Sequence, residues 1–86
     1  MKLDPNFIIH SSNGEYYVIT TGGGDFNGIV RNNETSDFIC RCLREDTTEE
    51  AIIEKMLETY NAERSDVERD VKLVIEKLRS IGAIND

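Results

Sequence analysis

Few residues of this 86-residue chain are of the types that carry out catalysis or bind metal ions. His10 is the only histidine, and Cys40 and Cys42 are the only two cysteines. Because residues i and i+2 of a helix do not face each other, Cys40 and Cys42 cannot form a disulfide or share a metal ion while that helix is intact. We expect Cys42 to pack in the core as a small hydrophobic residue and Cys40 to be a partly exposed free thiol.

The glycine-rich run at residues 21–25 (Thr-Gly-Gly-Gly-Asp) could suggest a phosphate-binding loop. It lacks the Gly-Lys-Ser/Thr of such loops, and no helix begins at its end to direct amide groups at a phosphate. We expect a flexible hairpin loop. The 17 acidic residues lie mostly on helix faces opposite apolar stripes and are read as solvated surface. No metal-ligand spacing or nucleophile motif appears, so we expect no enzymatic activity, no metal site and no cofactor.

The composition is that of a soluble globular domain, with 38% hydrophobic and 31% charged residues. The pattern predicts a single domain over residues 1–86. No apolar run is long enough to span a membrane or to form a signal peptide, which leads us to expect a cytoplasmic protein. Free cysteines suit that reducing compartment.

The first third of the chain predicts three strands, at residues 7–10, 16–21 and 28–31. The second strand is rich in aromatic and β-branched residues, which favour a half-buried sheet. Asn13-Gly14 between the first two strands is a strong hairpin signal because both residue types tolerate positive φ. A small antiparallel sheet is therefore expected.

The remainder predicts three helices. Asn32 or Asn33 can cap the first, which is expected to run to about Leu43. Capping boxes start the second helix at Thr47, with Glu50, and the third at Ser65, with Glu68. Gly82 is expected just beyond the last helix. The first helix is expected to bury Thr35, Phe38, Ile39 and Cys42. The order β-β-β-α-α-α predicts an α+β fold, winged-helix-like, with a three-stranded antiparallel sheet followed by three helices on one side.

A sheet this small has edge strands whose backbone groups are available to a partner. The third strand carries no proline or acidic residue from Phe26 to Val30 to block such pairing. One interpretation is that an extended peptide adds there as another strand, and a second is pairing between two copies of the chain. If a peptide adds, we expect Val30→Pro to remove a donor from the free edge.

The third helix supplies a possible second wall for such a peptide. One flank of the helix carries Asp66, Asp70, Leu73 and Lys77, and the other carries Glu68, Lys72 and Arg79. Leu73 falls well away from the centre of the apolar stripe and is expected near the surface. The periodicity leaves open which flank faces the edge strand.

Several short motifs follow one another within residues 7–84. They are Asn33-Glu34-Thr35, Phe38-Ile39, Thr47-Thr48-Glu49-Glu50, Tyr60, Asp70-Val71, Leu78 and Gly82-Ala83-Ile84. In this order they resemble the PqqD-like family, typified by pyrroloquinoline quinone biosynthesis protein D and also called precursor peptide recognition elements. The chain departs from the family at Asn32, where leucine is usual.

The resemblance implies a non-catalytic peptide chaperone. Such a domain binds the leader segment of a ribosomally synthesised precursor peptide by strand addition and presents it to a modifying enzyme, often a radical S-adenosylmethionine (radical SAM) maturase. Carried over to this chain, the peptide-binding residues are Gly28, Ile29, Val30 and Arg31 on the strand, and Asp66, Arg69, Asp70, Leu73 and Lys77 on the helix.

Two other functions also fit a winged-helix-like fold. DNA binding needs a basic face to neutralise phosphates. The net charge of −7 and the mixed charges of the third helix disfavour nucleic acid as a partner. A homodimeric scaffold that pairs through the third strand remains an alternative.

Overall fold

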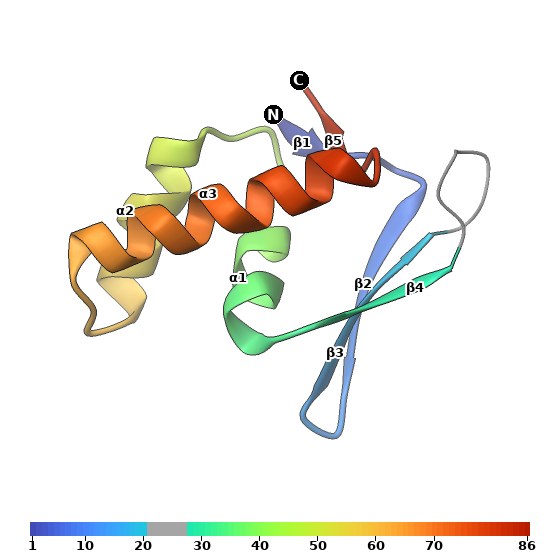
Figure 1. The fold of residues 1–86 in the computed structure, drawn as a ribbon, viewed down its shortest axis with the longest axis horizontal. Coiled ribbons are helices and arrows are strands. Elements are labelled where there is room, and N and C mark those ends of the chain that lie inside the picture. The colour runs from blue at the N-terminus through green and yellow to red at the C-terminus, as the bar shows by residue number, and fades with distance from the viewer. Residues whose placement is uncertain (21–27) are drawn as a thin grey trace.

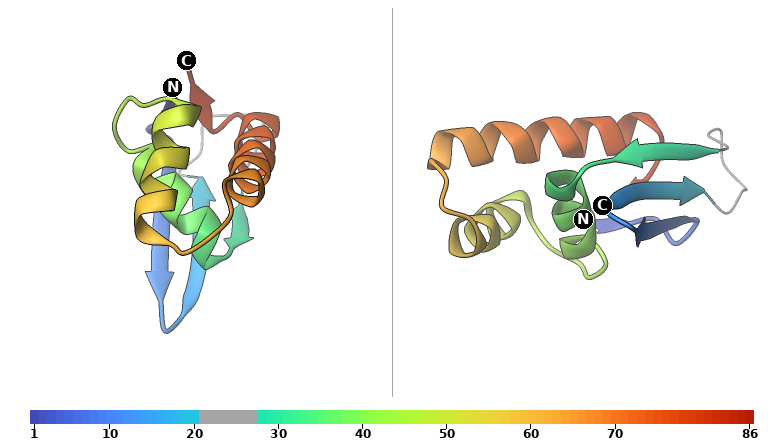
Figure 2. Two further views of the ribbon diagram at one scale, coloured as in Figure 1. Left: turned by 90° about the vertical axis from the view of Figure 1, so that its left-hand side faces the viewer. Right: turned by 90° about the horizontal axis from the view of Figure 1, so that it is seen from below.

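The computed structural model, which describes residues 1–20 and 28–86, has the predicted α+β architecture (Figure 1). Three antiparallel strands, in spatial order β2-β3-β4, precede three helices. Their bounds are β2 Phe7–Ser12, β3 Glu15–Thr20, β4 Ile29–Asn32, α1 Glu34–Cys42, α2 Glu49–Thr59 and α3 Arg64–Ser80. The helices gather at one end and on one side of the sheet (Figure 2).

The turn between β2 and β3 confirms the hairpin signal. Asn13 and Gly14 both adopt positive φ, at 52° and 78°, and join the paired residues Ser12 and Glu15. A two-residue turn with this geometry matches the twist of the flanking strands. The glycine-rich run at residues 21–25, read above as a hairpin loop, lies outside the described residues.

A second, smaller sheet that we did not predict joins the ends of the chain. β1 (Lys2–Leu3) pairs antiparallel with β5 (Ile84–Asn85). The chain reaches β5 through Gly82, whose φ of 76° ends α3, and the Ala83 amide donates to the Leu78 carbonyl at 2.9 Å. This confirms Gly82 as the residue beyond the helix.

The predicted cap of the first helix is confirmed, whereas the predicted starts of α2 and α3 need correction. Asn33, one of the two expected candidates, caps α1, and its Oδ1 accepts a hydrogen bond from the Ser36 amide at 2.8 Å. For α2 the cap is Thr48 rather than Thr47. The Thr47 amide instead donates to the Met1 carbonyl at 2.9 Å, which holds Thr47 against the first residue of the chain.

The capping box expected at Ser65 is wrong, because α3 begins at Arg64 and its N-cap, Glu63, makes no side-chain capping bond. Glu68 does not reach back to the helix start. It accepts from Arg64 Nε at 3.1 Å, and the same guanidinium contacts Glu50 and, at 2.8 Å, Glu54 of α2. Arg64 therefore ties α3 to α2 at the point where α3 begins.

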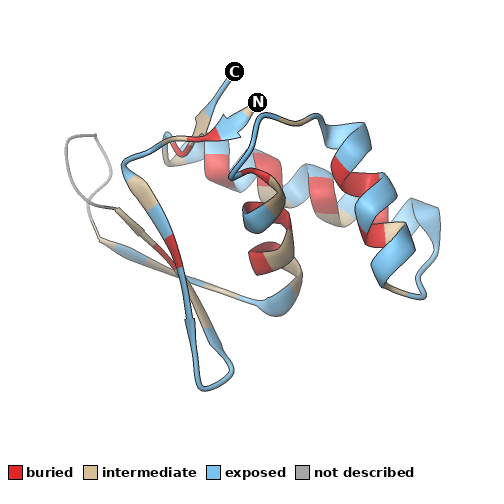
Figure 3. Cartoon of the chain, turned by 180° about the vertical axis from the view of Figure 1, so that it is seen from behind, coloured by how far each residue is buried: buried red, intermediate tan, exposed pale blue. Residues whose placement is uncertain are grey.

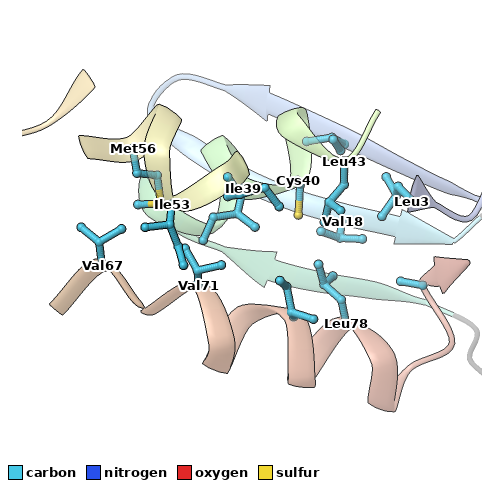
Figure 4. Close-up of a cluster of buried hydrophobic side chains, with 14 residues drawn as sticks. Leu3, Val18, Ile39, Cys40, Leu43, Ile53, Met56, Val67, Val71 and Leu78 are labelled. Carbon is cyan, nitrogen blue, oxygen red and sulfur yellow. The ribbon is translucent and has the colours of Figure 1, made fainter. Parts of the chain in front are cut away.

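The core lies where the three helices meet one face of the sheet. Figure 3 shows the buried residues on the facing sides of the helices. Figure 4 shows Ile39 of α1, Ile53 of α2 and Val71 of α3 in the same cluster. Val18 of β3, 1% exposed, and Leu3 of β1, 7% exposed, extend this cluster to the two sheets.

The orientation of α1 reverses the expectation for its cysteines. Cys40 is fully buried, whereas Cys42 is only partly buried. Of the predicted stripe, Ile39 is fully buried as expected, whereas Thr35, Phe38 and Cys42 are only partly buried. The other buried residues here are Ser36, Asp37, Cys40 and, at the C-cap, Leu43. Asp37, which as an acidic residue was expected at the surface, is buried on this face and forms an ion pair with Arg41.

Candidate peptide-binding site

Among the residues that the structure describes, β4 pairs on one side only, with β3. The Thr20 amide donates to the Gly28 carbonyl at 3.1 Å, so these two residues form a hydrogen-bonded pair just before β4. Successive residues of a strand direct their backbone groups to opposite sides. The backbone groups of Val30 and Asn32 therefore face β3, and those of Ile29 and Arg31 face the open edge.

This register corrects one expectation about the edge. We expected the Val30 amide to be available to an added strand, but Val30 pairs with Val18 on the bonded side of β4. The available amides are those of Ile29 and Arg31, and the described residues offer them no hydrogen-bond partner. The expectation about Val30 was wrong because the pairing with β3 decides which amides of β4 face the open edge. The local sequence of β4 does not specify that pairing.

The side chains of β4 alternate between the two faces of the sheet. Val30 packs against the core, next to Val18. Ile29 lies on the other face and is 64% exposed, in a cross-strand row with Ile19 and Ile8. Arg31 lies on this outer face too. An added strand would continue both faces beyond β4.

A shallow pocket of about 240 Å³ lies where β4 ends and α1 begins. It is closed on the other side by α3. Its lining residues are Asn33, Thr35, Ser36, Asp70, Leu73 and Val74. Leu73 is 57% exposed, in agreement with its expected place off the core stripe.

The pocket places the flank of α3 that carries Asp70 and Leu73 beside the end of β4. Residues of the opposite flank, Lys72 and Arg79, line a different cavity near Met1. Lys77 follows Asp70 by seven residues, so it projects from nearly the same face of α3, about two turns further on. Arg69 projects further out and contacts Asp66 at 3.2 Å and Asp70 at 3.9 Å.

Of the nine residues expected at the site, only Asp70 and Leu73 line the pocket. Gly28, Ile29, Val30 and Arg31 form or adjoin the edge strand, whereas Asp66, Arg69 and Lys77 lie outside the pocket lining. Sequence reasoning missed the other lining residues, Asn33, Thr35, Ser36 and Val74. Their place directly after an edge strand is the signal that could have found the first three.

Neither cysteine is activated as a nucleophile. Burial raises the pKa of Cys40 from 9.0 to about 11. Burial also raises the pKa of Cys42, and the nearby Lys55 opposes that shift. Both thiols are therefore protonated near neutral pH, and a protonated thiol is a poor nucleophile.

Within residues 1–20 and 28–86, no group of three histidine, cysteine or acidic side chains is arranged to hold a metal ion. Within the same ranges no helix combines the length and the apolar character needed to cross a membrane.

One protein family is similar to this chain over most of its length. The family model described as coenzyme PQQ synthesis protein D (PqqD) matches residues 8–84. No curated protein matches the chain.

Two solved structures share the fold. One, described as TbiB1 in complex with the TbiA(beta) leader peptide, aligns with a TM-score of 0.79 and 18% identity over 100% of both chains. The other, a lasso peptide synthetase B1 complexed with the leader peptide, aligns with a TM-score of 0.76 and 19% identity over 99% of this chain and 96% of its own. The family match spans nearly the whole chain, and the chain therefore belongs to the PqqD family.

Proposed function

We propose that this chain is a non-catalytic peptide chaperone, which binds the leader segment of a ribosomally synthesised precursor peptide and presents it to a separate modifying enzyme. The observation that carries the proposal is the open edge of β4 beside the pocket at Asp70 and Leu73. The edge offers backbone hydrogen bonds, and the pocket offers a site for a side chain of the added strand.

Membership in the PqqD family supports this function, because the family is one of precursor peptide recognition elements. Both solved structures with the same fold are described as complexes with leader peptides. The modifying enzyme would act on the part of the precursor that follows the bound segment. We infer that this enzyme is a radical SAM maturase, as the family resemblance implies.

The contacts available at β4 and Leu73 can supply the free energy that leader binding requires. Micromolar affinity corresponds to about 8 kcal/mol. Bonds to the backbone groups of Ile29 and Arg31 would be supplemented by burial of Leu73, which is 57% exposed in the free domain. A bound strand would also cover an edge that otherwise presents unpaired amides.

The test is an NMR titration of the ¹⁵N-labelled domain with a synthetic leader segment of the precursor peptide encoded beside it. We expect amide shifts at Ile29, Arg31, Asp70 and Leu73. Amides of the exposed face of α2, such as those of Lys55 and Glu58, serve as the internal control. Shifts confined to β2, the other edge strand, would place the peptide elsewhere, and absence of shifts would contradict the proposal.

Sedimentation separates peptide binding from a homodimeric scaffold that uses the same edge. If β4 binds the leader, a free domain that is monomeric stays monomeric when leader is added, and one that is dimeric dissociates. A dimer that persists at saturating leader, with the amides of Ile29 and Arg31 protected from hydrogen exchange in both states, would favour the scaffold.

A further inference from the structure

The flank of α3 beside β4 carries opposite charges at its two ends. Asp66 and Asp70 lie at the pocket end, and Lys77 lies two turns further along the helix. Leu73 lies between them and is 57% exposed. Seven residues of helix separate Asp70 from Lys77 by about 10 Å along the axis. A strand bound along this flank would therefore meet an acidic, an apolar and a basic surface in turn.

The acidic end is not neutralised by its neighbours. Arg69 contacts both Asp66, at 3.2 Å, and Asp70, at 3.9 Å, so a single cation serves two carboxylates. The positive end of the α1 dipole is also near the pocket, but Glu34 and Asp37 in the first turn of α1 offset it.

Lys77, at the other end, is exposed. It forms no ion pair with any residue in the described part of the chain. Its ammonium group is therefore available to an acidic side chain of a ligand.

The topology sets the direction in which a peptide would meet these charges. β4 and α3 run in opposite directions (Figure 2). Every strand pair of the large sheet is antiparallel, and an antiparallel addition to β4 is the more stable one. Such a strand runs in the same direction as α3, from the pocket at Asp70 toward Lys77.

The spacing follows from strand geometry. Side chains alternate between the two faces, so those that face α3 are two residues, or about 6.6 Å, apart. Three successive side chains on that face span about 13 Å. This length covers the separation of Asp70 and Lys77 once the reach of their own side chains is included.

We propose, resting on the function proposed above, that the leader segment selected by this chain carries a basic, an apolar and an acidic residue at alternate positions, in that order from its N-terminus. The basic residue meets Asp70 and Asp66, the apolar residue covers Leu73, and the acidic residue meets Lys77. Charge order thus selects both the peptide and its direction along β4.

The test is selection of a displayed library of random twelve-residue peptides on the immobilised full chain, followed by sequencing. We expect enrichment of Lys or Arg four positions before Asp or Glu, with an apolar residue midway. A single exposed ion pair contributes roughly a two- to fivefold preference, so the two pairs together favour this order by on the order of tenfold over the reversed order.

The matched variant is the double charge exchange Asp70→Lys with Lys77→Asp, which leaves the net charge unchanged. Lys77 is exposed and the Asp70 side chain is 47% exposed, so the fold should tolerate the exchange, and circular dichroism checks this. The exchanged domain should enrich acidic residues four positions before basic ones.

The outcomes distinguish this inference from the function on which it rests. Retained peptides with no positional preference for charge, or with the acidic residue first on the wild-type domain, would overturn the charge order while leaving peptide binding intact. Failure of the wild-type domain to retain any peptide above an unrelated immobilised protein would overturn both. The wild-type result alone decides the inference if the exchanged variant does not fold.

Discussion

Arg41 donates a hydrogen bond from Nε to Oδ2 of Asp37, one turn earlier in α1, at 2.6 Å, and from Nη2 to the Ser11 hydroxyl of β2 at 3.1 Å. The Asp37 side chain is only 7% exposed, whereas that of Arg41 is 42% exposed. The other carboxylate oxygen of Asp37, Oδ1, has no hydrogen-bond partner in the described part of the chain. Arg41 is therefore the main compensation for a nearly buried carboxylate, and it joins α1 to the sheet.

The first prediction concerns this pair. Arg41→Ala leaves the Asp37 carboxylate buried without a partner, and we expect the free energy of unfolding to fall by about 1 to 3 kcal/mol. The partial exposure of Arg41 keeps this below the cost of breaking a fully buried pair. Urea denaturation followed by circular dichroism measures the change.

The control for Arg41→Ala is the double variant Asp37→Asn with Arg41→Ala. Asparagine keeps the shape of the side chain but removes its charge, so the double variant should be more stable than Arg41→Ala alone. A double variant that is less stable would show that the pair contributes through packing rather than charge.

The second prediction uses the register of β4. Arg31→Pro removes an amide from the open edge, where proline is tolerated, and we expect leader affinity to fall about five- to thirtyfold with little change in melting temperature. Val30→Pro removes a bond to β3 and should instead lower the melting temperature. Calorimetric titration and thermal denaturation measure the two effects.

Arg31→Ala is the matched control for the proline variant. It removes the same side chain but keeps the amide, so the difference between the two variants isolates the backbone bond. Equal affinities for the alanine and proline variants would argue against strand addition at β4.

The order of the elements could be predicted from the sequence because each depends on local pattern. The Asn13-Gly14 turn and the Gly82 ending need only particular φ values, which neighbouring residues do not alter. The pairing of β1 with β5 could not be foreseen, because two-residue strands show no alternation and their partners lie at opposite ends of the chain.

The site was less predictable because it depends on contacts between distant segments. In α1, Asp37 and Cys40 are buried while Cys42 is only partly buried, and the local pattern of apolar residues does not predict this. Similarly, the amides that face the open edge of β4 follow from the Thr20–Gly28 bond, not from the composition of β4. The sequence identified Leu73 as exposed, but only the fold places it beside the end of β4.

The third prediction tests the exposed leucine at the proposed site. Leu73 is 57% exposed, so Leu73→Ala should change the free energy of unfolding by less than about 0.5 kcal/mol. Loss of its contact with a bound leader should weaken binding by about 1 kcal/mol, or about fivefold. Calorimetric titration with the leader segment checks the second effect.

Leu78 of the same helix, only 5% exposed, provides the contrast for Leu73. Leu78→Ala should cost about 2 to 5 kcal/mol of stability because it creates a cavity in the core. Leu73→Ala with unchanged leader affinity would move the peptide away from this flank of α3.

The fourth prediction follows from the buried thiol of Cys40. Burial raises its pKa in the folded protein from 9.0 to about 11. Below pH 9 the Cys40 thiol is protonated in both the folded and the unfolded chain. Its contribution to the free energy of unfolding is then fully present and does not change with pH. Between pH 9 and 11 the unfolded chain releases the proton while the folded chain retains it, so stability falls as pH rises, by at most about 1.4 kcal/mol per pH unit.

Other groups contribute in the same direction, because the pKa values of Cys42 and Tyr60 are also raised by burial. The comparison with Cys40→Ala removes this background, since that variant keeps both groups. Urea denaturation of the two proteins from pH 8 to 11 should give curves that differ by a constant amount up to pH 9. Above pH 9 the wild type should lose more stability than the variant, and parallel curves up to pH 11 would mean that the Cys40 thiol reaches solvent in the folded protein.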